Sequence, residues 1–164
     1  MLQDAPNPEC KIEIVIPGNK IPSWFRVQSS GPSTRTKLYP NWCTSGWMGF
    51  ALSVYFPANS SSNNFSCVIS FLGENLKVSK ESITEKESSS GYIWLLHLTP
   101  DYFPINWLHN SFGNIEFTFH AHALFNGNSS NSCCGPCGVR LVYENDREKL
   151  CQIMNGHCNE SEDE

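Results

Sequence analysis

Short runs of apolar residues, separated by polar loops, recur along the whole chain. The clearest run covers residues 114–123, where apolar and polar side chains alternate strictly. Ile115, Phe117, Phe119 and Ala121 fall on one face, and Glu116, Thr118, His120 and His122 fall on the other. A period of two is that of a β-strand with one buried face. This segment therefore predicts a strand that contributes its apolar face to a core.

Further runs have strand character, because they are rich in β-branched and aromatic residues and are bounded by turn formers. They cover residues 11–16, 34–38, 47–56, 66–72, 76–79, 92–98 and 138–143. Residues 146–155 have a helical pattern, but no helical segment of about 10 to 15 residues lies between the strands. The chain is therefore predicted to be all-β, an antiparallel β-sandwich of jelly-roll or Ig-like type with about eight strands and one short C-terminal helix.

The length of 164 residues suits one domain with a sizeable core. Residues 1–10 are expected to be an N-terminal lead-in, residues 11–148 the β-sandwich, and residues 149–164 a short helix followed by a disordered acidic tail. Polar segments at 57–64, 79–91 and 126–136 are too poor in apolar residues to order themselves, and we expect them to be surface loops.

The segment Ile14 to Phe25, with the sequence IVIPGNKIPSWF, combines a strand, two turns and an aromatic anchor. Pro17 cannot donate to a strand ladder and Gly18 tolerates turn dihedral angles, so the strand should end there. Pro22 fixes a second turn, and Trp24 and Phe25 supply enough apolar area to hold that turn on a core. The pattern indicates a structural role.

The amino-acid composition disfavours two classes of binding partner, nucleic acid and membrane. The formal net charge is -5, and Glu160, Glu162, Asp163 and Glu164 near the C-terminus account for most of it. A sequence pI of about 5.5 and the lack of a Lys/Arg cluster disfavour nucleic acid as a partner. No apolar run in the sequence is long enough to span a membrane, so no membrane partner is expected.

The eight cysteines admit two interpretations. An even number of cysteines and the N-x-Ser/Thr acceptors at Asn59, Asn64, Asn128 and Asn159 suit a secreted, disulfide-bonded, lectin-like module. The low cysteine density and the lack of a signal-like N-terminus favour reduced thiols in a cytoplasmic protein. We favour the second interpretation and keep the first as the alternative.

Two groups of residues were weighed as metal sites. One comprises Cys133, Cys134, Cys137, Cys151, His157 and Cys158, and the other comprises Glu116, His120 and His122. The spacing of the first group does not suit zinc, and the second lacks an evident further ligand. Neither a nucleophile elbow nor a P-loop is present in the sequence. We therefore expect no metal, no cofactor, no catalytic residue and no enzymatic activity in this chain.

Five segments in order carry a resemblance to a known family: IVIPGNKIPSWF, LYPNW at 38–42, GFALSVYF at 49–56, WLLHL at 94–98 and CGVRLVYEND at 137–146. Together they resemble the domain that follows the leucine-rich repeats in plant TIR-type nucleotide-binding disease-resistance receptors. This is the C-terminal jelly-roll and Ig-like domain, and the likeness covers residues 12–148.

The resemblance implies a β-sandwich and a role in immunity. In such receptors this domain helps the leucine-rich repeats of the same chain to recognise a pathogen effector protein, and recognition activates an NAD-cleaving TIR domain elsewhere in the receptor. The expected partners are therefore the effector and the repeats, and the expected location is cytoplasmic or nucleo-cytoplasmic. The chain itself would be the non-enzymatic sensing end.

The resemblance also separates motif positions from candidate contacts. The positions that match the family motif are interpreted as structural: Pro17, Gly18, Ile21, Pro22, Trp24, Phe25, Gly49, Phe50, Gly138, Val139, Leu141 and Tyr143. Loops vary without disturbing a rigid sandwich, and interface cores favour large aromatics. The candidates for partner binding are therefore Tyr39, Trp42, Asn59, Asn63, Asn64, Phe65, Tyr102, Phe103 and Trp107.

Overall fold

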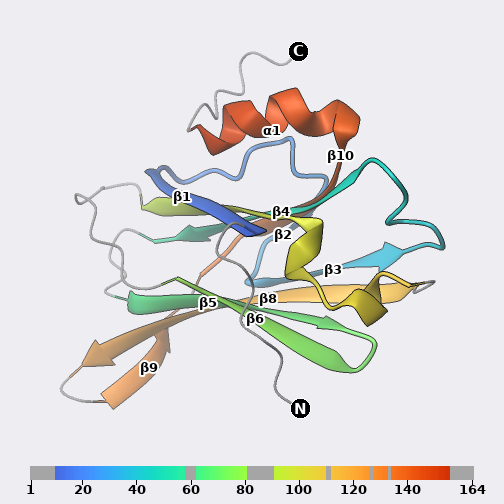
Figure 1. Ribbon diagram of the computed structural model, residues 1–164. Helices are drawn as coiled ribbons and strands as arrows, with labels where there is room; N and C mark the ends of the chain where they lie inside the picture. Colours follow the sequence, from blue (N-terminus) through green and yellow to red (C-terminus); the bar gives the residue numbers. More distant parts are fainter. Residues whose placement is uncertain are drawn as a thin grey trace.

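The strands form two antiparallel sheets stacked face to face, as the computed structural model in Figure 1 shows. The structure describes residues 10–57, 62–80, 91–109, 112–125, 128–132 and 134–155. Each sheet supplies alternate side chains to a shared interior, which is the arrangement expected of a β-sandwich. The predicted fold class is therefore confirmed.

The first sheet, sheet A, has the strand order β1-β7-β4-β10-β2. Its members are β1 (Lys11–Pro17), β7 (Tyr92–Leu98), β4 (Trp47–Phe56), β10 (Cys137–Tyr143) and β2 (Val27–Ser29). The central strand β4 is buried along most of its length, because its inner face lies on the other sheet and its outer face is also covered. This is why its sequence is mostly apolar on both faces and does not alternate.

The second sheet, sheet B, has the order β3-β8-β5-β6, and β9 pairs with β8 beside this path. Its strands are β3 (Ser33–Leu38), β8 (Gly113–Phe125), β5 (Ser62–Phe71), β6 (Glu74–Lys80) and β9 (Asn128–Ser132). The alternation in β8 is confirmed, because Ile115, Phe117, Phe119 and Ala121 are all buried.

Two strands were missed and two expected loops were partly wrong. The short edge strand β2 has only three residues, too few to show a pattern. Strand β9 lies inside the expected loop 126–136, and β5 begins at Ser62 inside the expected loop 57–64. In β9, pairing with β8 overrides the low strand propensity of an Asn- and Ser-rich sequence. The expected loop 79–91 lies largely outside the described residues.

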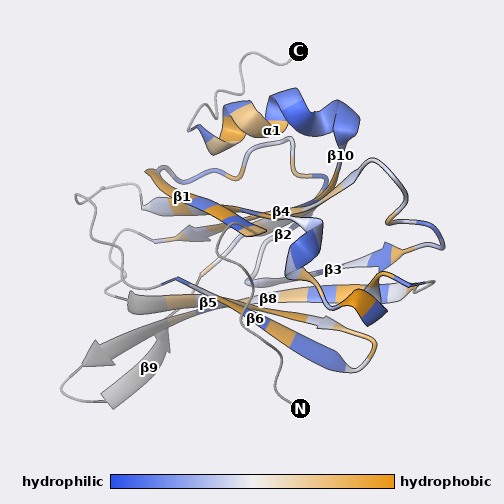
Figure 2. Cartoon of the chain, in the orientation of Figure 1, coloured by the Kyte–Doolittle hydropathy of each residue, from blue (hydrophilic) through white to orange (hydrophobic). Residues whose placement is uncertain are grey.

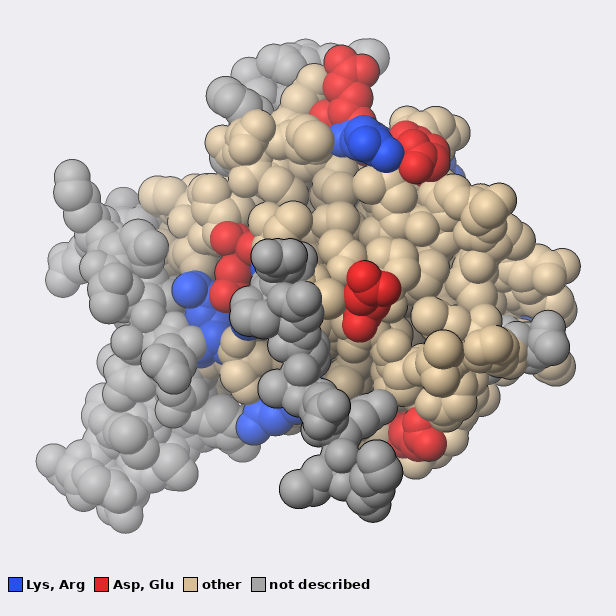
Figure 3. All heavy atoms as spheres, viewed as in Figure 1, with Lys and Arg blue, Asp and Glu red and all other residues tan. Residues whose placement is uncertain are grey.

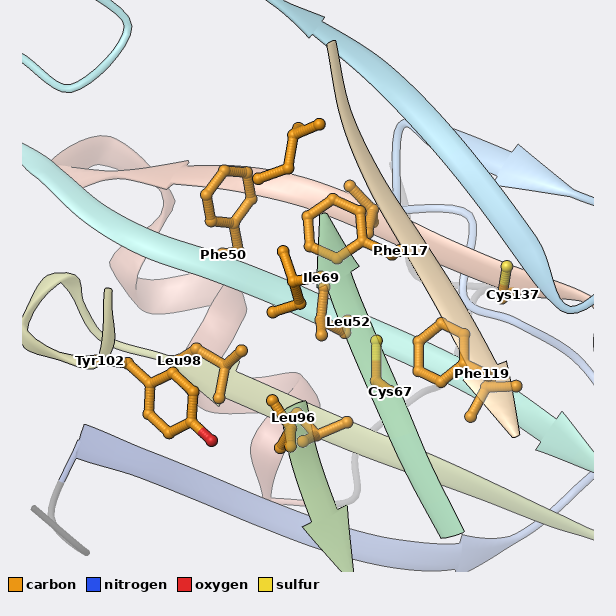
Figure 4. Packing of buried hydrophobic residues seen from close by; sticks show 14 of the residues in the cluster. Phe50, Leu52, Cys67, Ile69, Leu96, Leu98, Tyr102, Phe117, Phe119 and Cys137 are labelled. Atoms are coloured by element: carbon orange, nitrogen blue, oxygen red, sulfur yellow. The ribbon is translucent and has the colours of Figure 1, made fainter. Parts of the chain in front are cut away.

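The main core fills the space between the sheets. In Figure 4, Phe50 and Leu52 of sheet A face Ile69 and Phe117 of sheet B. The rings of Phe50 and Phe117 have centroids 5.4 Å apart. Figure 2 shows the corresponding apolar positions along the strands of both sheets.

A second apolar cluster covers the outer face of sheet A. It joins Ile93 and Leu95 of β7 to Phe25 and to Leu150 and Ile153 of helix α1 (Arg147–Met154). The predicted helix is thus confirmed, and Figure 1 shows it lying over sheet A. Because its apolar side chains are buried there, the helix packs on the sheet and does not stand apart from it.

Three 3₁₀ turns complete the described elements: η2 (Pro100–Tyr102), η3 (Ile105–Trp107) and η4 (Glu144–Asp146). The first two follow β7 and lie at the end of the sandwich where β5 and β3 finish and β6 and β8 begin. The third leads from β10 into α1. No helix among the described residues is long and apolar enough to cross a membrane.

Candidate protein-binding surface

Most of the aromatic residues expected to contact a partner come together at one end of the sandwich. The ring of Trp107 lies 6.2 Å from Phe103 and 5.4 Å from Phe71, measured between centroids. Trp42 lies 6.3 Å from Phe71, and Tyr102 lies 5.9 Å from Phe103. Residues far apart in the sequence therefore build one aromatic cluster.

The sequence predicts that these aromatic side chains are exposed on loops, but in the structure they are buried. The exposed fraction is 6% for Trp42, 8% for Tyr102, 6% for Phe103 and 1% for Trp107. Phe65 is also buried and packs against Phe56, away from this cluster. Burying such large rings removes much apolar area from water, which outweighs exposing them at loop tips. The clustered rings of Trp42, Tyr102, Phe103 and Trp107 form the base of the candidate surface.

Four other apolar side chains at this end are exposed: Tyr39, Leu72, Ile105 and Phe112. Leu38 pairs with Gly113, so Tyr39 and Phe112 lie side by side just beyond the β3–β8 pairing. Leu72 is in the β5–β6 turn, and Ile105 is in η3 beside Trp107. We call these four residues the apical patch. It lies on the right in the view of Figure 1.

Of the apical patch, only Tyr39 was among the candidate contacts. Leu72, Ile105 and Phe112 were missed because they are single apolar residues in short segments with no periodic pattern. A signal existed in each case: Leu72 and Phe112 each precede a glycine, and Ile105 stands between Pro104 and Asn106. An apolar residue flanked by turn formers lies outside the strands, so the buried face of a strand does not carry it into the core.

Hydrogen bonds fix the loops that carry the apical patch. Trp42 N–H donates to Tyr39 O at 3.1 Å, and Tyr143 Oη donates to Trp42 O at 2.5 Å. Cys43 Sγ donates to Leu108 O at 3.3 Å, which ties the turn after β3 to the end of η3. The exposed side chains therefore stand on a rigid base, a condition that lowers the entropic cost of binding.

Charge around the apical patch is sparse. Lys37 Nζ lies 5.3 Å from the centroid of the Tyr39 ring. The Glu74 carboxylate accepts hydrogen bonds from Trp107 Nε1 and Asn106 Nδ2, and these bonds lower its pKa. On the face seen in Figure 3, the Lys and Arg side chains of the described residues are scattered and form no continuous basic area. The surface is suited to an apolar contact.

The motif positions lie mainly in the packed interior, and none of them belongs to the apical patch. Ile21, Pro22, Phe25, Phe50, Gly138 and Val139 are buried, and Trp24, Leu141 and Tyr143 are half-buried. Pro17 ends β1, and Gly18 N–H donates to Gly91 O. A Cβ at Gly138 would meet Phe25 Cβ at 2.9 Å, so the motif loop packs directly on β10. These positions shape the scaffold.

Three asparagine candidates cannot be placed at the apical patch. Asn59 lies outside the described residues, as do the side chains of Asn63 and Asn64, whose backbone is in β5. Their role in partner binding stays a prediction.

No disulfide joins any two of the cysteines in the described part of the chain, which are Cys10, Cys43, Cys67, Cys134, Cys137 and Cys151. Burial raises the pKa of Cys67 well above its usual value and that of Cys137 to about 11. No group of three metal-ligating side chains occurs within the described part of the chain. Cys133, His157, Cys158 and the side chain of His122 lie outside it.

Comparison with known proteins gives a consistent result. The family model of the C-JID domain matches residues 16–148. Disease resistance protein RPP2B of Arabidopsis thaliana is 42% identical over 43 residues, which is 26% of this chain and 4% of that protein. Disease resistance-like protein DSC1 of the same plant is 45% identical over 47 residues, or 29% of this chain and 4% of that protein. The matched segments thus cover a small part of both relatives.

Proposed function

The chain belongs to the C-JID domain family, the post-repeat domain of TIR-type disease-resistance receptors, and from this premise we propose that it recognises a pathogen effector protein through the apical patch. The domain would act with the leucine-rich repeats of the same receptor, in the cytoplasm or in both cytoplasm and nucleus. Binding would trigger signalling by the receptor's TIR domain, including NAD cleavage, while this chain performs no catalysis.

The observation that carries the proposal is the apical patch. Five large apolar side chains among the described residues are highly exposed; four of them lie together at this end, and the fifth, Ile12, lies on edge strand β1. Ile105 is 72% exposed and Tyr39 is 64% exposed, although a buried aromatic cluster lies directly beneath them. Grouped apolar exposure on a soluble scaffold marks an interaction site.

The class of partner follows from the chemistry of the surface. A contact made of one aromatic ring and aliphatic side chains, with few charges, fits the apolar centre of a protein–protein interface. The alternative of a secreted, disulfide-bonded lectin-like module has no support from the comparisons, since both relatives are described as disease-resistance proteins.

The test uses a full-length receptor that carries this domain. The receptor is co-expressed in leaf tissue with a panel of secreted pathogen proteins, and cell death is scored. We expect one pathogen protein to trigger cell death with the wild-type receptor and to fail with the double variant Leu72→Ser and Ile105→Ser. Both changes lie on the surface, where substitutions cost within about 0.5 kcal/mol of stability, so the receptor should accumulate normally.

The matched control is Ile12→Ser, which also replaces an exposed isoleucine but on the outer face of sheet A. It should leave the response intact. An undiminished response from the double variant, with wild-type accumulation, would show that recognition does not use the apical patch.

A further inference from the structure

The Glu74 carboxylate joins two of the segments that carry the apical patch, the β5–β6 turn and η3. Leu72 belongs to the β5–β6 turn, and Glu74 is the first residue of β6, two positions later. Ile105 and Trp107 belong to the same three-residue turn, η3. Glu74 Oε1 accepts a hydrogen bond from Trp107 Nε1 at 2.7 Å and another from Asn106 Nδ2 at 3.2 Å. The Glu74 side chain therefore sets where Ile105 stands relative to Leu72.

The backbone hydrogen bonds of turn η3 are local, and the bond from Cys43 Sγ to Leu108 O ties η3 to the turn after β3 and not to the β5–β6 turn. Trp107 N–H donates to Pro104 O, and Leu108 N–H donates to Ile105 O. These bonds shape the turn but do not fix its position on sheet B. The Trp107 ring packs on Phe71, yet apolar packing is non-directional. The hydrogen bonds that Trp107 and Asn106 donate to the charged Glu74 carboxylate supply the direction.

Trp107 needs this partner. Its side chain is 1% exposed, and the indole N–H is a donor with no acceptor capacity of its own. Without the Glu74 carboxylate, the buried donor would lose its partner, and Trp107 would gain by shifting toward water. A shift of Trp107 moves Ile105, which is two residues away in the same turn.

We propose that Glu74 is a positioning residue for recognition: its carboxylate holds η3 against the β5–β6 turn, so that Ile105 and Leu72 present one preformed contact surface. The inference rests on the proposed function of the apical patch. Glu74 need not touch the partner. It acts by reducing the disorder that binding would otherwise have to remove.

The experiment compares Glu74→Ala and Glu74→Gln with the control Glu148→Ala, an exposed acid on α1. Hydrogen exchange of the Trp107 indole N–H is measured by NMR on the 164-residue chain. Affinity is measured with the pathogen protein that triggers the full-length receptor in the cell-death assay. A thermal unfolding curve is also recorded for each variant, to compare its stability with that of wild type.

We expect Glu74→Ala to speed indole exchange and weaken binding about tenfold, with a small fall in melting temperature that leaves the chain folded. Glu74→Gln keeps a carbonyl acceptor but loses the charge. Its indole exchange rate and its affinity should lie between those of wild type and Glu74→Ala. The control should match wild type in both readouts.

Unchanged indole exchange in Glu74→Ala would overturn the inference, because the tether would then not hold η3. Faster exchange with unchanged affinity would also overturn it, provided that Leu72→Ser and Ile105→Ser still weaken binding. If those two patch variants bind like wild type, the proposed function fails, and the inference fails with it.

Discussion

The guanidinium of Arg140 lies over the ring of Trp24, with 4.6 Å between Cζ and the ring centroid. Arg140 Nη1 also donates to Trp24 O at 2.8 Å, and Arg140 Nη2 pairs with Asp146 Oδ1 at 2.8 Å. Asp146 Oδ2 in turn accepts from Tyr143 N–H. One arginine thus joins the IPSWF segment near the N-terminus to β10 and to the start of α1.

This relationship predicts a large effect of Arg140→Ala on stability. The Arg140 and Asp146 side chains are only 13% and 14% exposed. Removing one partner leaves a half-buried charge and the Trp24 carbonyl without their donors. We expect the free energy of unfolding to fall by about 2 kcal/mol, measured by urea denaturation.

The control for this change is Arg147→Ala. Arg147 also pairs with an acid, Glu144, but the two side chains are 59% and 62% exposed. Exposed pairs contribute about 0 to 1 kcal/mol. Equal losses in the two variants would contradict a special role for Arg140.

Gly49 predicts a second strong effect. Its φ is +102°, and a Cβ there would lie 1.9 Å from Leu98 O. Gly49→Ala should therefore cost about 3 kcal/mol or more, because the strain of a positive φ adds to displacement of the β7 backbone. Gly31→Ala, which meets nothing within 4 Å, should stay within about 0.5 kcal/mol of wild type. Thermal unfolding distinguishes them, and similar melting temperatures would contradict the packing at Gly49.

The thiols should differ sharply in reactivity. Burial and a raised pKa leave little thiolate on Cys67 and Cys137 at neutral pH, whereas Cys151 is exposed. Timed alkylation of the native chain with peptide mass mapping should label Cys151 first and these two last. After denaturation without reductant, all described cysteines should be labelled. Protection of Cys67 or Cys137 in the denatured chain would reveal a disulfide and contradict the free thiols.

The Glu74 tether should titrate below the ordinary glutamate pKa of about 4.3. Its hydrogen bonds favour the charged form and lower the folded-state pKa. The stabilising contribution is therefore fully present above the unfolded pKa and is lost as pH falls through the lower, folded value. The indole N–H signal of Trp107, followed by NMR, should change with a midpoint below 4.3. A midpoint at or above that value would contradict the tether.

The local pattern of apolar and polar residues was sufficient to predict the strands that bury one or both faces. Strand β8 could be predicted because Ile115, Phe117 and Phe119 alternate with polar residues, and β4 because most of its residues are apolar. Strand β9 could not be predicted from its own sequence, since its strand conformation comes from pairing with β8. Likewise, Trp107 was found as a large aromatic in the right region, but its burial depends on Phe71, which lies far from it in the sequence, as well as on the nearby Phe103. Exposure of Ile105 and Leu72 follows only once the aromatics beneath them are placed.

The most direct test of recognition by the apical patch is a hydrogen–deuterium exchange footprint. The chain is measured alone and with the pathogen protein that triggers the full-length receptor. The account predicts that binding slows exchange in the turn after β3, in the β5–β6 turn and around η3. Slower exchange confined to β1 and α1, with those three segments unchanged, would contradict it.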